Sequence, residues 1–286
     1  MVDSGFMDFD REPAPRAAAA ARLKELLAPN VLDVPLLPEA AGRVMAAARA
    51  AEPDLRRIVA LIGRDPALTG HVLRVANSAA NARGGRLGSV SQAVGRLGLT
   101  AIAEMALVVS CRTRLFCAPG FEREVRQLFR HSYATALFAQ EVARACRLDV
   151  ESAFVAGLMH DVARPLLREV VARLAAELDG GDVAGAALVD AHHAEVGALI
   201  VERWQLGPRV VEAVLHHHGE PATSAVAVVQ LADALGHLLL DEARELEPLA
   251  RHPARLMLNL YDDELAAVAA HRDRIVAAVD AVEGLA

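Results

Sequence analysis

The sequence reads AGLMHD at residues 156–161, an apolar run that ends in an adjacent His-Asp pair. Phe154, Gly157 and His160-Asp161 recur at a spacing of three to four residues, which places them on one face of a helix. The pattern predicts a helix over residues 149–161 that directs this pair toward the interior. A buried carboxylate must be paired, protonated or bound to a metal. The stretch therefore predicts a helical core that carries polar chemistry.

The same helical period extends in both directions along the chain. Apolar residues recur every three or four positions from Ala17 onward. Aromatic residues make up 3% of the chain and Ala is abundant, which favours helix over strand. These features predict an all-α fold. The helices predicted after residue 120 cover residues 121–147, 149–161, the segment from a break at Pro165 to 178, 183–204, 208–218 and 223–240, with two amphipathic helices in 241–286.

Composition excludes several classes of protein. A chain of 286 residues with 54% hydrophobic content has ample core for one large domain or two lobes. The longest stretch without a charged residue, 221–232, is shorter than the roughly 20 residues of a membrane span. Three cysteines without a CxxC pair, and no secretory signal, indicate the cytoplasm. A net charge of −7 argues against nucleic-acid binding.

Proline and glycine divide the chain into candidate units. Residues 1–30 are predicted to be a tail followed by a lead-in helix. The turn at Pro119-Gly120 is the best candidate boundary between two helical lobes, at about 31–118 and 119–237. Residues 238–286 are predicted to form a C-terminal helical extension.

Histidine is concentrated in the second half of the chain, where eight of the eleven lie between His131 and His237. Five predicted helices each direct a ligand-type side chain to an apolar face. Imidazoles and carboxylates that converge in a helical core form a site for one or two divalent cations. The absence of Cys from the set argues against a closed structural zinc site and leaves Mn, Fe, Zn or Mg. The predicted ligands are His131, His160, Asp161, His193, His217, His218 and Asp233.

Each of these residues also has a simpler interpretation. A single inward histidine is most often a hydrogen-bonded core residue, so the metal hypothesis rests on the set as a whole. His192 and His216 adjoin proposed ligands but face about 100° away on a helix, and we interpret them as flanking. His237 lies one turn beyond Asp233 and is a candidate for a supporting contact. Asn77 is interpreted as a helix-end hydrogen-bonding residue rather than a ligand contact.

The order of these residues resembles the HD superfamily of metal-dependent phosphohydrolases. The wider context resembles the HDOD domain, a two-lobed helical relative of that superfamily, over about residues 31–237. The segments that carry the resemblance are Leu37-Pro38, DPAL at 65–68, LRVANS at 73–78, AVGRLG at 93–98, AGLMHD at 156–161, HAEVG at 193–197 with Trp204, and QLAD at 230–233.

The resemblance implies a bacterial signal-transduction output or regulatory module. HDOD domains are commonly degenerate at the metal-ligand positions, whereas every position that can be matched here carries a ligand-type residue. We therefore expect a divalent metal, with two ions as an option, and action through a signalling protein partner. The alternative is an active phosphohydrolase on a nucleotide or cyclic dinucleotide. In that case Asp161 would bridge two cations and Arg164 would stabilise charge on the phosphoryl oxygens.

Two departures from related enzymes restrict the alternative. The double histidine is similar to that of the HD-GYP phosphodiesterases of cyclic di-GMP, but Gly219-Glu220-Pro221 follows it instead of the Gly-Tyr-Pro element. We therefore expect weak or no hydrolysis of cyclic di-GMP. Gln127 stands one turn before His131, where some three-metal relatives carry Glu, so a third metal is not expected. Arg164 replaces the Lys that those phosphodiesterases carry three residues after the Asp.

Overall fold

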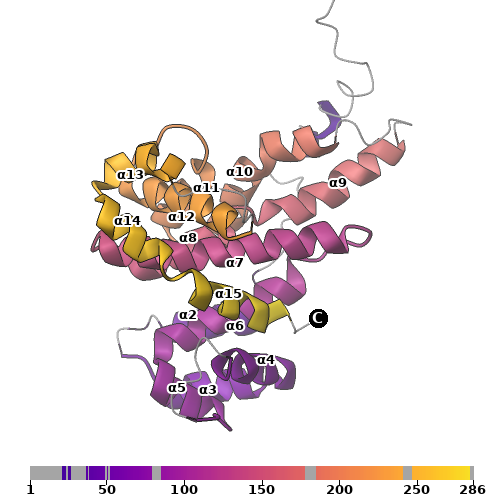
Figure 1. Ribbon diagram of the computed structural model, residues 1–286. Helices are drawn as coiled ribbons and strands as arrows, with labels where there is room; N and C mark the ends of the chain where they lie inside the picture. Colours follow the sequence, from indigo (N-terminus) through magenta and orange to yellow (C-terminus); the bar gives the residue numbers. More distant parts are fainter. Residues whose placement is uncertain are drawn as a thin grey trace, which may run out of the picture.

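The computed structural model describes residues 21–23, 25–26, 37, 39–48, 50, 52–78, 85–177, 185–240 and 247–283. All regular secondary structure in these residues is helical, which confirms the predicted all-α class. Figure 1 shows two helical lobes, with the indigo and purple helices of the first lobe below the longer helices of the second. Residues 1–20, most of the predicted tail, lie outside the described part. Among the described helices, none is both long and apolar enough to cross a bilayer.

The first lobe is built from short helices with side-chain caps. Asp54, Asp65 and Ser89 each accept a hydrogen bond from a backbone N–H in the first turn of the helix that follows. Helices α4 and α5 therefore begin directly after Asp65 and Ser89. The helices of this lobe are α2 (Glu39–Ala48), α3 (Leu55–Gly63), α4 (Pro66–Ala76), α5 (Val90–Leu97) and α6 (Leu99–Arg114).

The second lobe is organised around its longest helix, α7 (Glu122–Ala145), which crosses the full width of the lobe on the side toward the first lobe (Figure 1). Helices α8 and α12 pack along α7 on its buried face. The other pairs in contact among α8 to α12 are α8 with α12, α9 with α10, and α11 with α8, α10 and α12. Their bounds are α8 (Val150–Met159), α9 (Ala163–Glu177), α10 (Gly185–Arg203), α11 (Pro208–Leu215) and α12 (Ser224–Leu240).

Two glycines allow helices to approach α7 closely. A Cβ added at Gly157 on α8 would lie 2.8 Å from the Cα of Ala136, which is backbone and cannot move aside. A Cβ added at Gly236 on α12 would lie 2.7 Å from Oγ1 of Thr135 and 3.4 Å from the ring of His131. Close packing at these two positions draws the end of α8 and the middle of α12 against the same part of α7.

The C-terminal segment departs from the prediction of two helices. It contains a 3₁₀ turn and three α-helices: η2 (Glu247–Arg251), α13 (Pro253–Leu258), α14 (Asp262–Ala269) and α15 (Arg272–Glu283). His252 caps the start of α13, and Asn259, at φ 53°, ends it in the left-handed conformation. Asn adopts that conformation at low cost, so it ends a helix without glycine or proline.

Helix α15 packs against both α7 and α4, and it lies between the two lobes (Figure 1). Its ion pairs hold it to α7. The carboxylate of Glu141, buried on α7, binds Arg274 and also Arg144, whose Nη1 lies 2.6 Å away. Arg130 and Asp280 form a second pair at 3.0 Å. The C-terminal helix therefore joins the two lobes, and the lobe limits drawn from the sequence stay predictions.

Two predicted helix boundaries in the second lobe were wrong. Pro165 does not interrupt a helix but lies in the first turn of α9, where a residue without an N–H loses no helical hydrogen bond. Helix α11 ends at Leu215 instead of continuing to His218. His217 and His218 therefore lie on the turn that leads toward α12.

Candidate metal centre

The structure brings all seven predicted ligands together at the middle of the second lobe. His131, His193 and Asp233 lie on α7, α10 and α12. The His160-Asp161 pair lies on the turn between α8 and α9, and His217-His218 lies on the turn after α11. The prediction that five helices supply the ligands is therefore corrected to three helices and two turns. A turn lets two consecutive side chains point into one site, which a helix does not allow.

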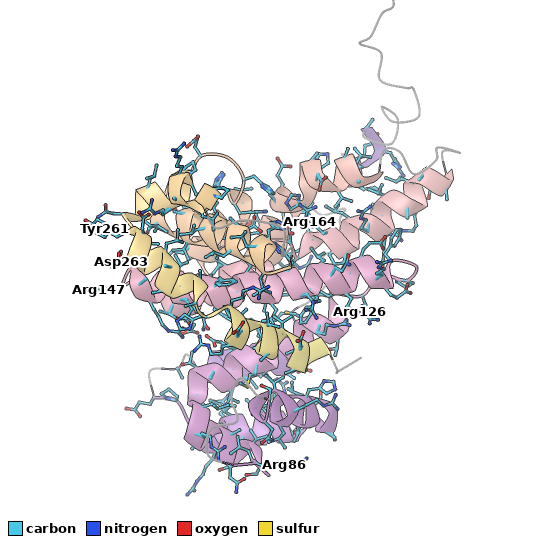
Figure 2. The ribbon with its side chains drawn as sticks, in the orientation of Figure 1. Arg86, Arg126, Arg147, Arg164, Tyr261 and Asp263 are labelled. Carbon is cyan, nitrogen blue, oxygen red and sulfur yellow. The ribbon has the colours of Figure 1, made fainter. Side chains whose placement is uncertain are left out.

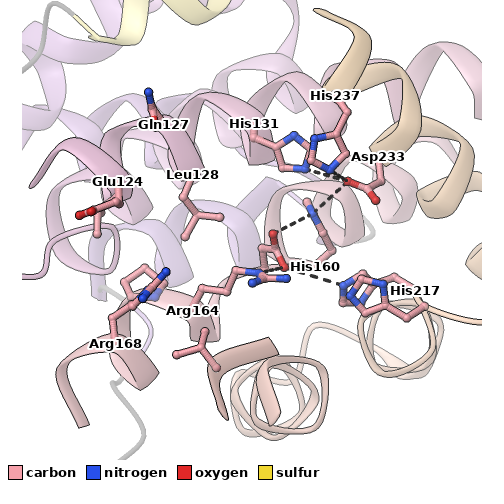
Figure 3. A pocket seen from close by; sticks show the side chains of 15 residues that line it. Glu124, Gln127, Leu128, His131, His160, Arg164, Arg168, His217, Asp233 and His237 are labelled. Carbon is pink, nitrogen blue, oxygen red and sulfur yellow. Dashed lines mark hydrogen bonds and ion pairs between the residues drawn. The ribbon is translucent and has the colours of Figure 1, made fainter. Parts of the chain in front are cut away.

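The first cluster consists of His131, His160 and Asp233, whose ligand atoms all lie within 4.8 Å of one another. Nε2 of His131 lies 2.7 Å from Oδ1 of Asp233 (Figure 3). Nδ1 of His160 donates to the carbonyl oxygen of Gly157 at 2.7 Å, which leaves Nε2 directed to the cluster. That Nε2 is buried and has no hydrogen-bond partner among the described residues.

The second cluster consists of His193, His217 and His218. Nδ1 of His193 donates to the carbonyl of Asp190 at 2.9 Å, and Nδ1 of His217 donates to that of Val214 at 2.7 Å. Each neutral ring then has its lone pair on Nε2, and these two nitrogens lie 3.2 Å apart. Nη2 of Arg164 lies 3.3 Å from Nε2 of His193, and Nε2 of His218 lies 2.9 Å from it, so the three rings converge on one point beside a guanidinium.

Asp161 lies between the clusters and faces both. Its Oδ2 is 3.4 Å from Nε2 of His160 in the first cluster. Its Oδ1 is 3.4 Å from Nε2 of His193 and 3.8 Å from Nε2 of His217 in the second. Ligand atoms that share an ion at about 2.0–2.2 Å lie roughly 3–3.5 Å apart, so these spacings suit one ion per cluster. The carboxylate has the position of a bridging ligand.

The electrostatics favour neutral imidazoles in the second cluster. Burial, reinforced by the charge of His160, lowers the pKa of His217 to about 3. Burial and the neighbouring Arg164 also lower the pKa of His193. Neutral imidazole is the form that binds a metal, so at neutral pH these rings have no proton to lose on Nε2. The donor set of imidazoles and carboxylates fits a borderline or hard divalent cation.

The carboxylates are ionised despite their burial. Burial opposes ionisation of Asp161, but His160 and Arg164 hold its pKa well below the ordinary value. Burial also opposes ionisation of Asp233, but the hydrogen bond from His131 and the charge of His160 hold its pKa below the ordinary value. Burial alone would lower the pKa of His160, yet Asp161 and Asp233 raise it to about 9. A cation in the first cluster would therefore replace the proton of His160.

Arg164 positions Asp161 and is itself held by a second carboxylate. Its Nε donates to Oδ1 of Asp161 at 2.6 Å, and its Nη1 donates to Oδ1 of Asp190 at 2.5 Å. Figure 2 shows Arg164 within the helical body of the second lobe. Asp190 was not predicted, although its place three residues before His193 on α10 is a signal visible in the sequence. Because two carboxylates hold its guanidinium, Arg164 fixes the orientation of Asp161 and also lines the cavity.

A cavity of about 400 Å³ opens onto both clusters (Figure 3). It extends away from them along α7 and α9, past Leu128 and Pro165, to Gln127, Glu124 and Arg168. Glu124 and Arg168 were not predicted as cavity residues.

The other residues singled out from the sequence have clear positions. The ring of His237 stacks on that of His131 with centroids 4.2 Å apart, and its Nε2 lies 3.5 Å from Oδ1 of Asp233, so it supports the first cluster. His192 and His216 belong to neither cluster. Asn77 ends α4, donates to the carbonyls of Leu73 and Leu87, and accepts from the N–H of Leu87. Its structural interpretation is confirmed.

Known proteins with similar sequences or folds were found. A Treponema pallidum (strain Nichols) protein of uncharacterized function is 27% identical over 210 residues, which cover 70% of this chain and 40% of that protein. Ribonuclease Y of Thermosipho melanesiensis is 30% identical over 112 residues, 38% of this chain and 18% of the enzyme. The chain therefore spans less than half the length of these curated relatives.

Solved structures share the fold over nearly the whole chain. A proposed metal-dependent phosphohydrolase from Shewanella amazonensis SB2B superimposes with a TM-score of 0.71 at 20% identity, and covers 96% of this chain and 99% of its own. A proposed signal transduction protein from Marinobacter aquaeolei VT8 gives a TM-score of 0.60 at 19% identity, and covers 99% and 69%. The sequence profile of the HDOD domain matches residues 34–220, about two thirds of the chain. The two-lobed helical fold and this match together show that the chain belongs to the HDOD domain family.

Proposed function

We propose that this protein is a metal-dependent HDOD signalling module that binds two divalent cations and acts through a protein partner. The observation that carries the proposal is the position of Asp161 between two clusters, one of two imidazoles and a carboxylate and the other of three imidazoles. The protonation states support it as well. Nε2 of His160 carries a proton that a cation would displace, and the neutral rings of His193 and His217 direct their Nε2 lone pairs toward each other. When bound, the cations would supply positive charge for a phosphate or carboxylate ligand.

In this proposal each residue has a defined task. His131, His160 and Asp233 would hold one cation, and His193, His217 and His218 would hold the other, with Asp161 shared. Arg164 keeps Asp161 ionised and fixed in orientation. The cavity beside the clusters leaves room for a ligand whose occupancy a partner protein would sense.

Metal titration of the purified protein tests the proposal. The protein is stripped with a chelator and titrated with Mn²⁺, Fe²⁺ and Zn²⁺ by calorimetry, with bound metal counted by mass spectrometry. We expect two ions per chain in the wild type. His217→Ala removes a ligand of the second cluster only, so it is expected to leave one ion. His216→Ala, an exposed neighbour outside both clusters, is the matched control and is expected to retain two. A wild type that binds no cation would refute the proposal.

Phosphoester hydrolysis is the second candidate function. The observation that favours it is the position of Asp161, because a carboxylate that faces two candidate cation sites suits a dinuclear hydrolase. Under this hypothesis the chain would orient a phosphate in the cavity beside Asp161. Arg164 lines that same cavity. A screen of nucleotides and cyclic dinucleotides with the Mn²⁺-loaded protein separates the candidates. Turnover that is lost in Asp161→Ala would make hydrolysis the primary function.

A further inference from the structure

Two arginines line the cavity beside the clusters, and they differ in their partners. Arg164 is bound by Asp161 and Asp190. Arg168, one turn further along α9, makes no hydrogen bond or ion pair with any described part of the chain, although it is partly buried. Its guanidinium nitrogens are not among the buried atoms that lack a partner, so water reaches them. A guanidinium that water reaches and that no described residue binds is available to an anionic group of a ligand in the cavity.

The surroundings of Arg168 favour an anionic ligand group. Leu128 and Pro165 form apolar walls of the cavity between Arg168 and the clusters, and apolar walls strengthen charge interactions. Glu124 also lines this end of the cavity, but it is exposed, and Figure 3 shows its carboxylate directed away from the clusters, whereas the guanidinium of Arg168 points toward the cavity. The planar guanidinium suits a phosphate or carboxylate through paired hydrogen bonds.

We propose that Arg168 binds a second anionic group of a ligand whose first phosphate lies at the Asp161 centre. The inference rests on the proposed function, because the first phosphate needs the cations there. Helix geometry sets the spacing, since residues four apart on a helix are displaced by about 6 Å along its axis. The site thus selects ligands that carry two anionic groups joined by a spacer of several bonds, and it discriminates against a single phosphate.

Calorimetry with phosphonates tests the proposal, because phosphonates cannot be hydrolysed. The probes are propylphosphonate and the bisphosphonates of propane, butane and hexane with one group at each end. We expect the best bisphosphonate to bind the Mn²⁺-loaded protein about 10- to 100-fold more tightly than propylphosphonate, the gain typical of a charge-assisted pair. Arg168→Ala is expected to abolish this preference and leave the affinity for propylphosphonate unchanged. Arg168→Lys is expected to keep part of it.

Arg173→Ala is the matched control, because Arg173 lies on α9, is exposed and does not line the cavity. It is expected to keep the full preference. Equal binding of mono- and bisphosphonates by the wild type, or a preference that persists in Arg168→Ala, would overturn the assignment of Arg168. A protein that takes up none of Mn²⁺, Fe²⁺ and Zn²⁺ would instead refute the proposed function. In that event bisphosphonate binding that is lost in Arg168→Ala would still support the anion site, and binding that persists would overturn it.

Discussion

The two oxygens of Asp161 have different neighbours, and this makes the residue the most sensitive position of the centre. Oδ2 faces the first cluster, while Oδ1 faces the second and accepts from Arg164. Asp161→Ala is expected to reduce metal content to one ion or none. His192→Ala, next to a ligand but in neither cluster, is expected to retain both ions. Mass spectrometry of metal content in the two variants provides the comparison, and equal content would contradict the assignment of Asp161 as the shared ligand.

Glu104 on α6 is a buried carboxyl outside the centre. Burial raises its pKa from an ordinary value of 4.5 to about 7, although Gln140 donates a hydrogen bond to it at 2.8 Å. The folded state therefore holds a proton that the unfolded chain releases between pH 4.5 and 7. The protonated carboxyl of Glu104 therefore contributes to stability below pH 4.5, and this contribution is lost as the pH rises through 7.

A comparison of Glu104→Gln with the wild type isolates this effect from the other titrating groups. As the pH rises from 5 to 8, the wild type is expected to lose up to about 3 kcal/mol of free energy of unfolding relative to the variant. Urea denaturation at four pH values in that range measures it. A difference that does not change with pH would show that Glu104 titrates normally.

The residue types of the centre could be predicted from sequence, but their partners could not. An adjacent His-Asp pair and histidines at apolar positions are visible in one dimension, because burial of a polar residue breaks the helical pattern. Asp190 and Arg168 do not break that pattern. Charged residues at the edge of a helix face are common, and only the packing of α9 on α10 shows which of them meet.

At the scale of elements, the contact of α8 with α7 depends on a residue without a side chain. Gly157→Ala would place a methyl group against the backbone of Ala136, so the helices must separate. We expect a loss of about 1–3 kcal/mol in the free energy of unfolding. Because His160 lies one turn beyond Gly157, metal content is also expected to fall.

Gly95→Ala on α5 is the control for this substitution. No atom lies within 4 Å of the added Cβ, so Ala is expected to stabilise the helix by about 0.5–1 kcal/mol. Chemical denaturation of both variants gives the two values. Equal effects from the two substitutions would show that the α7–α8 contact is not as close as described.

The sequence predicts where the helices of the second lobe lie better than it predicts the residues at which they begin and end. Pro165 was interpreted as a break, since proline ends most helices, yet the same residue is favoured in a first turn. The end of α11 at Leu215 had no proline or glycine at that point to mark it. Gln230 stabilises the turn that follows by donating to the carbonyls of His216 and Gly219, which are fourteen and eleven residues away in sequence.

At the scale of the molecule, the centre joins three helices and two turns, so a cation bound there would stabilise the whole second lobe. A ligand that binds only the folded state adds about 2.7 kcal/mol at a hundredfold excess over its dissociation constant. We expect thermal melting to shift upward on addition of Mn²⁺, Fe²⁺ or Zn²⁺ to chelator-treated protein. The Asp161→Ala variant is expected to show a smaller shift. Identical melting with and without every cation would contradict the prediction.

Cyclic di-GMP is expected to be hydrolysed weakly or not at all. The turn that carries Gly219 and Glu220 is short and is closed by Gln230, so it supplies little chain for a wall around a large ligand. Catalysis needs the phosphate in line with its attacking group, and an error of about 1 Å costs about a hundredfold. Product formation by Mn²⁺-loaded protein, with Asp161→Ala as the control for contaminating enzyme, measures this. Robust turnover lost in that variant would contradict the expectation.

Helix α15 also affects the way in which the protein is made. It packs on α4, about 200 residues earlier in the chain, and its Arg274 pairs with Glu141. During synthesis the first lobe and α7 emerge long before α15 does, and the surfaces that α15 covers stay open until it has emerged. Contacts between such distant parts of a chain form slowly. We therefore expect a stage of folding in which the surface between the lobes is exposed and available to a chaperone.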